Sequence, residues 1–551
     1  MHRTPRHLAA AALLWTAALV PAPAAAQRPA AVQGTVVIVH GAEASLPVPL
    51  VGSGTANRDV ASLLYLRLMT LGRDLMTSGD RGFEAALATA VTRRDSVTLV
   101  FDLDARARWH DGRPVTSRDV VFTFAIARDP KVAPQLALLL RRVASVDAEG
   151  DHRVVFRFSE VYGEQVYDAV WHVQPLPAHL VESIPPDQLA ASEYAQRPIG
   201  NGPYRFVRRD AGRQVELVSV PGHFLGNPRL TRVVFLLARD PEAQINLILD
   251  GTADILENIT PATNISRVEN RQEYRVVPVP TFTVGYLLFN QHAPGDRSAP
   301  HPILSDAEVR RALAMALDRD AMIRATFGAW SAVAEGPVAQ LHWIREPGVR
   351  AVRHDPAEAR RRLEARGWRD TNGDGVLDRN GAPLRLRLNY PGTSAARGHL
   401  AQQAQEQLRR IGVDLELMRL DGPVWYERRT KGEFDIDFSA ASMDPSPAGL
   451  VQSWSCGGRG GSNVAGYCNP VVDSLMEVAI RKSGDDARRA WWQVVRGINA
   501  DAPAIFLYAP ANAAAMHNRF TDVFVAPELL WSRLYLWGVT PGQQIARDRS
   551  P

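Results

Sequence analysis

The most informative segment of the chain reads Trp109-His110-Asp111-Gly112-Arg113-Pro114-Val115-Thr116-Ser117-Arg118-Asp119-Val120-Val121-Phe122. Its Asp-Gly pair predicts a turn. A helix should follow, because Thr116 can cap it and Asp119 stands three residues on, which is the spacing of a capping box. We expect this helix to bury Val120, Val121 and Phe124. Because His110 and Asp111 lie in the turn between strand and helix, we interpret them as structural residues rather than as metal ligands or an acid–base pair.

The patterns on either side of this segment predict alternating strands and helices. Apolar, β-branched runs indicate strands at residues 35–39 and 97–103. A helix should begin with the capping box at residues 305–308 and run to Leu317, and another should begin with Asp355 as cap. Residues 384–388, 400–411 and 413–417 predict a strand, a helix ended by Gly412, and a second strand. The fold class is therefore α/β.

The size and charge of the chain limit its domain organisation and its partners. A chain of 551 residues with 46% hydrophobic and 22% charged residues is too long for one compact domain, so we expect two or three lobes. Its 63 basic and 59 acidic side chains nearly balance. This balance argues against nucleic acid as a partner.

The beginning of the sequence has the layout of a secretory signal peptide. Arg3 and Arg6 precede an apolar stretch at residues 8–20 and the small residues 24–26, so we expect cleavage after Ala26 and a periplasmic protein. The apolar stretch is shorter than the roughly 18 residues that span a bilayer, so we expect no stable membrane insertion. In an oxidising compartment, Cys456 and Cys468 favour a disulfide over a metal site.

Residues 109–122 strongly resemble the signature of the family 5 extracellular solute-binding proteins, which are the dipeptide-, oligopeptide- and nickel-binding components of ABC importers. The resemblance continues in order along almost the whole exported chain. The matching segments are residues 198–204, 251–254, 285–290, 309–319, 405–413, 466–473 and 501–503. Most of them are turns, caps and core positions, so they indicate the fold more than the ligand.

The resemblance implies a two-lobed periplasmic-binding-protein clamshell of type II, with an extra domain inserted in the first lobe. We expect residues 33–62, 196–285 and 508–551 to form the first lobe and residues 63–195 the inserted subdomain. Residues 286–507 should form the second lobe. In such a protein the ligand closes the hinge, because it binds the closed state better than the open one.

The resemblance also implies a function and a binding site. We expect the protein to capture a short peptide between the lobes, as a monomer, and to deliver it to an ABC permease with a separate ATPase. In the family's peptide binders the peptide adds as an extended strand and an aspartate holds its terminal amine. The segment 41–47 resembles the first ligand-contacting edge, and the segment 438–444 resembles the second. The corresponding candidates are Glu43, Ala44, Ser45, Ala441, Ser442, Met443 and Asp444.

Asp444 is then the candidate amine anchor, since a carboxylate forms a strong charge-assisted hydrogen bond with an ammonium. The alternative interpretation is that Asp444, followed by Pro445, only starts a turn. Many family members carry Gly-Trp ahead of this aspartate, whereas this chain has two alanines. Trp425 and Trp454 could supply the stacking surface instead, although tryptophans are also common in cores.

Other functions and ligands remain open alternatives. A non-peptide ligand would be a nickel chelate, haem, a sugar or an opine-like metabolite, and a ligand-presenting sensory adaptor is a third class. The sequence contains no His-Glu-x-x-His, Gly-x-Ser-x-Gly or Gly-Lys-Ser/Thr motif, so we expect neither an enzyme nor a cofactor. Residues 370–378 resemble the start of a calcium loop, but the twelfth position is Gly381, so we favour a hairpin without metal.

Overall fold

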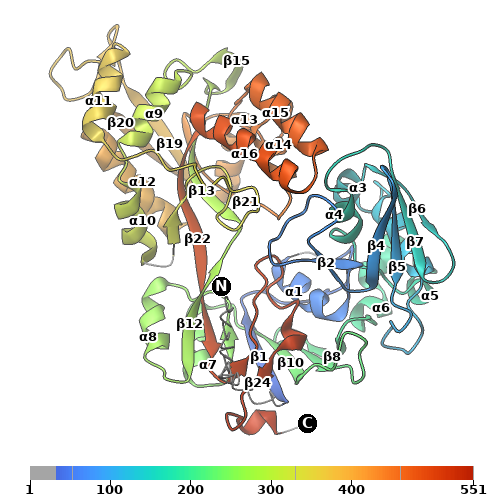
Figure 1. The fold of residues 1–551 in the computed structure, drawn as a ribbon. Helices are drawn as coiled ribbons and strands as arrows, with labels where there is room; N and C mark the ends of the chain where they lie inside the picture. The colour runs from blue at the N-terminus through green and yellow to red at the C-terminus, as the bar shows by residue number, and fades with distance from the viewer. Residues whose placement is uncertain (1–32, 53, 329–330, 460, 550–551) are drawn as a thin grey trace, which may run out of the picture.

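The computed structural model describes residues 33–52, 54–328, 331–459 and 461–549. The molecule consists of two lobes and a subdomain, and a long mixed sheet runs through both lobes (Figure 1). The α/β class predicted from the sequence is confirmed. The predicted signal peptide covers residues 1–26, which lie outside the described residues.

Strand β22 (Ala504–His517) connects the two lobes (Figure 1). Its first half pairs with β13 (Thr283–Phe289) and β16 (Ser331–Val333), and its second half pairs with β11 (Ile255–Leu256) and β12 (Tyr274–Pro280). The sheet order is β20-β19-β21-β13-β22-β11-β1-β10-β9-β8. Since one continuous strand serves both halves, the lobes are linked by backbone hydrogen bonds as well as by side chains.

The first lobe is built around the fully buried strand β1 (Gly34–His40), which pairs in parallel with β10 (Leu230–Leu237) and with β11. Strand β10 continues antiparallel to β9 (Gln214–Ser219), and β9 to β8 (Tyr204–Asp210). Because β1 is buried on both faces, its sequence is mainly apolar along its whole length, as expected of a central strand. The lobe is completed by α1 (Thr55–Leu64), α7 (Pro241–Leu249), α8 (Ile265–Glu269), β23 (Phe520–Thr521) and β24 (Gly538–Val539).

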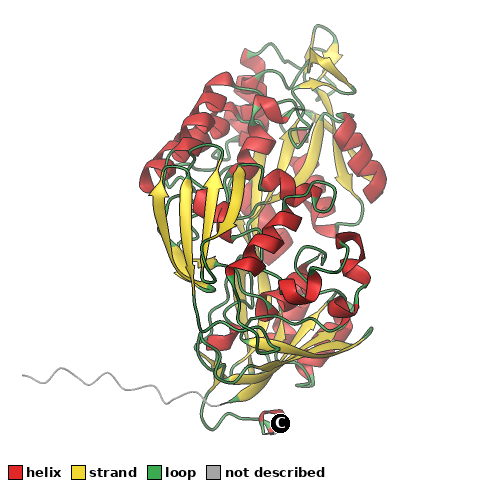
Figure 2. Ribbon diagram, turned by 90° about the vertical axis from the view of Figure 1, so that its right-hand side faces the viewer, coloured by secondary structure: helices red, strands yellow, loops and turns green. Residues whose placement is uncertain are grey.

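The subdomain contains a four-stranded antiparallel sheet, visible in Figure 2 beside the helices that cover it. The sheet order is β4 (Ala88–Asp95), β5 (Thr98–Leu103), β7 (Arg153–Phe158) and β6 (Val143–Ala148). Its other elements are β2 (Met69–Leu71), β3 (Phe83–Ala85), α2 (Ser117–Ala127), α3 (Pro134–Leu139), α4 (Gln165–Val170), α5 (Ala178–Val181) and α6 (Glu193–Gln196).

Helix α2 begins as the sequence predicts. Thr116 is its cap, and the backbone amide of Thr116 donates to Asp119 Oδ2 at 2.8 Å, which completes the capping box. Val121 is only half-buried, because it lies at the margin of the face that packs on the sheet. His110 Nε2 donates to the carbonyl of Gly202 at 2.9 Å. Burial lowers the pKa of His110 to about 4, so the ring is neutral and holds the turn, as the structural interpretation expects.

The second lobe contains the predicted strand–helix–strand unit. Strands β19 (Arg385–Pro391) and β20 (Asp414–Leu420) pair in parallel, and α12 (Ala395–Arg409) connects them. Gly412 has a φ of 86°, the left-handed conformation that ends a helix. The remaining helices are α9 (Ala307–Met315), α10 (Arg319–Phe327), α11 (Pro356–Ala365), α13 (Gly422–Lys431), α14 (Ala448–Trp454), α15 (Pro470–Arg481) and α16 (Gly484–Asp501). The remaining strands are β14 (His292–Ala293), β15 (Asp296–Pro300), β17 (Asp378–Arg379), β18 (Ala382–Pro383) and β21 (Ile436–Ser442).

Helix α9 differs from its prediction at both ends. Its cap is Asp306 and not Ser305, because the Asp306 carboxylate accepts a hydrogen bond from the amide of Glu308 at 2.9 Å. It ends at Met315, two residues before Leu317. In the segment that resembles a calcium loop, the carboxylate of Asp370 accepts hydrogen bonds from the amides of Gly373 and Gly375, which is typical of a tight hairpin.

The disulfide between Cys456 and Cys468 is present, which confirms the pairing predicted from the sequence. It closes a short loop between α14 and α15. We expect the double substitution Cys456→Ser and Cys468→Ser to lower the free energy of unfolding by about 3 kcal/mol, because the unfolded chain regains the entropy of the open loop. Chemical denaturation measures this change. A reductant should destabilise the native protein by the same amount as the double substitution and leave the variant unaffected. Equal denaturation midpoints for the native protein and the variant would contradict the prediction.

Candidate ligand-binding site

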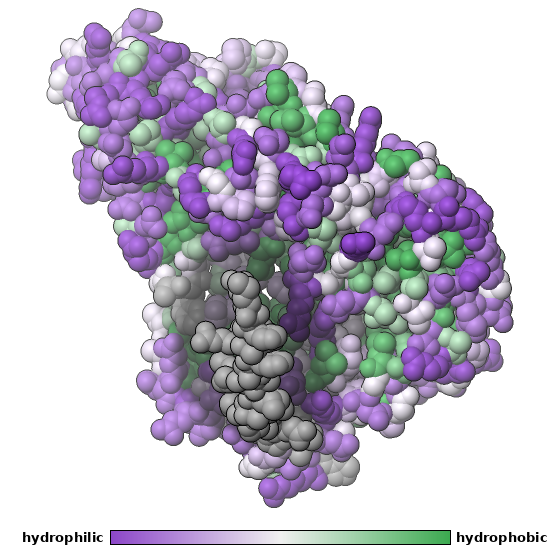
Figure 3. All heavy atoms as spheres, viewed as in Figure 1, coloured by the Kyte–Doolittle hydropathy of each residue, from purple (hydrophilic) through white to green (hydrophobic). Residues whose placement is uncertain are grey.

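A cavity of about 450 Å³ lies between the subdomain and the second lobe. The subdomain contributes Ser78, Leu139, Arg141, Arg142, Tyr162, Glu164, Asp168 and His172. The facing wall comes from residues 441–453 and from α15 and α16. Figure 3 shows the molecule hollowed between its lobes, with hydrophilic side chains along much of the border. The volume of the cavity and its mixed polar and apolar lining are typical of a small-molecule site.

Four predicted site residues meet at this cavity. Ala441, Ser442, Met443 and Asp444 line it, at the end of β21. Pairing with β13 holds this end in place, because Ser442 lies opposite Thr283 and the amide of Met443 donates to the Phe282 carbonyl at 3.0 Å. The chain then leaves the sheet, and the side chain of Asp444 remains accessible. A strand end therefore presents a carboxylate to the cavity.

The surroundings of Asp444 combine a turn with a charged cluster. Its Oδ1 accepts a hydrogen bond from the amide of Ser446 at 3.0 Å, so the predicted turn is present. Burial among protein atoms raises the pKa of Asp444 even though the side chain has accessible surface, because that surface borders a confined cavity. His172 and the Ser446 amide oppose this rise, whereas the charge of Asp168 adds to it.

Glu164 joins the two walls of the cavity. One carboxylate oxygen accepts a hydrogen bond from Thr77 of the subdomain, and the other accepts from Ser446 Oγ of the second lobe at 2.8 Å. Burial raises the pKa of Glu164 to about 8, and the nearby charges of Asp168 and Asp444 add to the rise, against these two hydrogen bonds. A neutral Glu164 is therefore favoured at neutral pH while the cavity holds no cation.

Asp168 and His172 extend this acidic end of the cavity. Asp168 accepts a hydrogen bond from Tyr162 Oη at 2.6 Å and lies 3.3 Å from His172 Nε2. Arg141 and Arg142 border the same cavity, and Arg142 is paired with Glu160 at 2.6 Å. Carboxylates attract ammonium groups and guanidinium groups attract carboxylates. The lining thus holds both carboxylates and guanidinium groups, the two kinds of partner that a zwitterion needs.

The other five predicted site residues lie elsewhere. Glu43 contacts the β8–β9 turn, where it accepts from the Gly212 amide at 3.1 Å and lies 3.5 Å from Arg209. Ala44 is buried in the first-lobe core and Ser45 is exposed. Trp425, on α13, donates to Asp437 at 2.8 Å. Trp454 is buried, with its ring about 6 Å from those of Tyr286, Phe506 and Tyr467. Their contact with a ligand stays a prediction.

A second cavity of about 720 Å³ adjoins the first at His172, which borders both. Its walls come from residues 48–52 and 54–58 of the first lobe and from residues 132–136 and Gln174 of the subdomain. The segment 48–58 directly follows the predicted first edge at residues 41–47. The two cavities therefore connect the neighbourhoods of both predicted edges.

The sequence analysis did not predict the acidic residues of the cavity, although their spacing in the sequence indicates them. Glu164, Asp168 and His172 recur at steps of four residues, whereas the residues between them are mainly apolar. Helical spacing of this kind places polar side chains on one face of a helix. In the structure Asp168 lies on the short buried helix α4, Glu164 directly precedes it and His172 follows it, and all three side chains line the cavity.

Comparison with known proteins identifies the family. Residues 82–463 match the sequence pattern of the bacterial extracellular solute-binding proteins, family 5, middle region. The chain belongs to this family. Family 5 is a family of extracellular binding proteins, so its members are defined by the capture of solutes. The recognition made from residues 109–122 is confirmed.

Two family 5 relatives show how far the similarity extends. A protein of Brucella ovis, whose name carries the words ABC transporter peptide-binding protein, is 29% identical over 420 residues, covering 74% of this chain and 75% of its own. The oligopeptide-binding protein AppA of Bacillus subtilis is 26% identical over 495 residues, covering 88% of this chain and 87% of its own.

Solved structures confirm the clamshell fold. AppA from Bacillus subtilis, in complex with a nonapeptide, superposes with a TM-score of 0.71 at 24% identity, covering 93% of this chain and 100% of its own. NikA from Brucella suis, in complex with Fe(III)-EDTA, gives a TM-score of 0.78 at 17% identity, covering 92% and 99%. Within the described part of the chain, no helix has the length and apolarity needed to cross a membrane. The segment boundaries given above for the lobes stay a prediction.

Proposed function

We propose that this family 5 protein captures a short peptide in the 450 Å³ cavity and delivers it to an ABC permease driven by a separate ATPase. It is exported to the periplasm with cleavage after Ala26, acts as a monomer and performs no catalysis. Support for the peptide comes from the relatives, which include an oligopeptide-binding protein that aligns with 88% of this chain.

The charge layout of the cavity is the observation that carries the proposal. Glu164, Asp168 and Asp444 form an acidic cluster in its lining, and Arg141 and Arg142 border the same space. Asp444 is the amine anchor, because it lies at the end of β21 and its Oδ1 alone receives the hydrogen bond from the Ser446 amide. The nearby Tyr167 hydroxyl can donate to the same carboxylate, and a peptide ammonium would share the carboxylate with it. The ammonium would also favour the charged form of Glu164, whose pKa burial raises.

The two walls of the cavity come from different parts of the protein, the subdomain and the second lobe, so a ligand that binds both can hold the cavity closed. The subdomain and the second lobe already touch through Glu164 and Ser446, and the Gly163 amide donates to the Ile480 carbonyl at 2.8 Å. A peptide that contacts both walls adds to these contacts only when the walls are together. Its binding therefore shifts the population toward the closed state.

Native mass spectrometry and calorimetry with di- to pentapeptides test the proposal. Asp444→Asn keeps the side-chain shape and the bond from Ser446 but removes the charge, so affinity should fall roughly 10- to 100-fold, the worth of a hydrogen bond to a charged group. N-acetylated peptides should bind the native protein just as weakly and be insensitive to the substitution. Asp486→Asn, at an exposed carboxylate on α16, is the matched control.

Three outcomes would count against this function. Equal affinities for free and acetylated peptides would remove the amine anchor. A retained non-peptide mass, such as a nickel chelate, haem, a sugar or an opine-like metabolite, would favour the alternative ligand class. Peptide binding without any transport defect in a strain lacking the gene would favour a sensory adaptor.

A further inference from the structure

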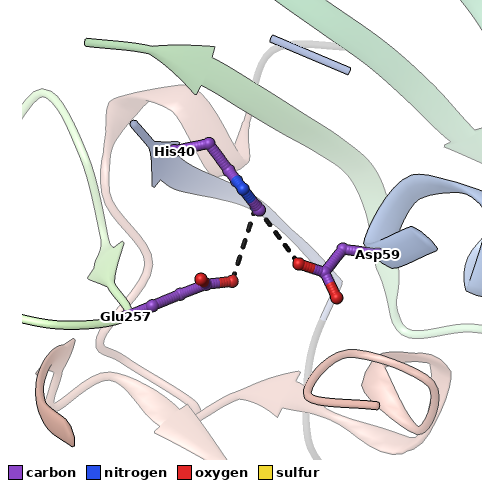
Figure 4. Close-up of side chains that lie close together, drawn as sticks. All are labelled: His40, Asp59 and Glu257. Atoms are coloured by element: carbon purple, nitrogen blue, oxygen red, sulfur yellow. Dashed lines mark ion pairs between the residues drawn. The ribbon is translucent and has the colours of Figure 1, made fainter. Parts of the chain in front are cut away.

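A second cluster of ligand-type side chains lies in the first lobe, apart from the cavity. His40 is the last residue of β1, Asp59 lies on α1 and Glu257 follows β11 (Figure 4). The Nε2 atom of His40 is 3.5 Å from Glu257 Oε1 and 3.9 Å from Asp59 Oδ2. The facing atoms of all three lie within 4.8 Å of one another. Three segments distant in sequence therefore converge on one point.

Two of the three facing polar atoms lack hydrogen-bond partners among the described residues. His40 is 7% exposed and Asp59 is 3% exposed. Among the described residues, neither His40 Nε2 nor Asp59 Oδ2 has a hydrogen-bond partner. Buried polar atoms are almost always satisfied, so two orphans aimed at each other call for an occupant between them. Burial lowers the pKa of His40 and, together with Glu257, raises that of Asp59.

We propose that His40, Asp59 and Glu257 bind a divalent transition-metal ion, with Zn²⁺ as the first candidate. One imidazole nitrogen and two carboxylate oxygens form a donor set that suits zinc. The +2 charge of the ion balances the two carboxylates, which otherwise repel each other in a buried site. Ligand atoms on a tetrahedral zinc lie about 3.4 Å apart, and the His40–Glu257 separation of 3.5 Å already has this size.

The surroundings hold these ligands in place. Trp531 Nε1 donates to Glu257 Oε1 at 2.8 Å, which fixes the carboxylate and leaves that oxygen a second lone pair. The ring of His40 packs edge-on against Phe235 at 5.2 Å. Such outer contacts orient metal ligands. The side chain of Glu257 is 19% exposed, which provides a route for an ion from solvent.

The position of the cluster suggests what the ion does. His40 and Asp59 stand at the two ends of the segment 41–58, which contains the predicted first ligand-contacting edge and a wall of the 720 Å³ cavity. An ion bound by both residues closes this segment into a loop and attaches it to β11. It would thereby order one wall of the cleft without contacting the ligand. This role is independent of which solute the cleft takes.

The competing explanation is a proton shared between Asp59 and Glu257, and Zn²⁺ titration separates the two. The full exported chain is stripped with a chelator, desalted and titrated with Zn²⁺ alone by calorimetry, with metal content measured by mass spectrometry. We expect one equivalent to bind and the melting temperature to rise. Asp59→Asn and Glu257→Gln should each weaken binding at least tenfold, since even outer-shell changes have effects of this order.

Two control variants locate the ion. Asp444→Asn should bind Zn²⁺ like the native protein, which excludes a metal chelate in the cleft. His354→Ala should also leave binding unchanged, because His354 is an exposed histidine 3.9 Å from a single carboxylate, Asp318. Bound Co²⁺ gives a second readout, since its visible absorption reports coordination directly.

The proposal is overturned if the native protein shows no saturable Zn²⁺ binding, or if Asp59→Asn and Glu257→Gln bind as it does. Misfolding is not expected to obscure the result. Asp59→Asn removes a buried like charge, so the metal-free variant should melt no lower than the metal-free native protein. Glu257→Gln retains an acceptor for Trp531 and provides the test if the first variant is poorly expressed.

Discussion

Arg519→Ala is expected to lower the free energy of unfolding by about 3–5 kcal/mol, the usual cost of removing one partner of a buried ion pair. The Arg519 side chain is fully buried between Asp254 at 2.9 Å and Asp548 at 2.7 Å, both equally buried. It also donates to the carbonyl of Thr35 at 2.7 Å. Without the guanidinium, two carboxylates in the first-lobe core lose their common partner. Guanidinium chloride denaturation measures the change.

The control is Arg229→Ala at an exposed pair. Arg229 lies 2.7 Å from Asp522, and both side chains are more than two-fifths exposed. Solvent screens this pair, so the expected change is about 0–1 kcal/mol. Equal losses for the two variants would show that the buried network contributes no more than a surface contact. Arg519→Lys should recover only part of the loss, because one ammonium nitrogen cannot replace the separate guanidinium nitrogens that contact Asp548, Asp254 and the Thr35 carbonyl.

Glu164→Gln is expected to change how stability depends on pH. The pKa of Glu164 is about 8 in the folded protein, above its ordinary value of 4.5. The folded state therefore retains a proton that the unfolded chain releases, so stability is fully present below pH 4.5 and is lost as pH rises toward 8. We expect the free energy of unfolding to fall by roughly 2–4 kcal/mol over this range. This is less than the full pKa shift implies, because the carboxylate borders a cavity.

Thermal unfolding from pH 5 to pH 9 checks this sign. The Glu164→Gln variant should match the native protein near pH 5 and be more stable at pH 8 and above, because the glutamine stays neutral. Glu427→Gln, at an exposed position on α13, should follow the native curve at all values of pH. Parallel curves for the native protein and the Glu164→Gln variant would contradict the raised pKa.

Local sequence patterns specified much of the fold correctly. The capping box at Thr116, the β19–α12–β20 unit and the disulfide were all predicted, and each depends on residues close together in the chain. Residues 441–444, which the family resemblance predicted as part of a ligand-contacting edge, lie at the end of β21 and line the cavity, and their contact with a ligand stays a prediction. The cap of α9 was wrong by one residue, because Ser305 and Asp306 are both good caps and only the backbone path decides between them.

The composition of the two sites depended on the tertiary structure. The acidic end of the cavity combines Glu164 and Asp168 of the subdomain with Asp444 of the second lobe, and the first-lobe cluster combines His40, Asp59 and Glu257. No periodicity relates such distant positions. By itself the sequence determined the family and the local elements. The tertiary structure decided which charges meet and how deeply they are buried, because desolvation and Coulomb energies depend on distances in space and not along the chain.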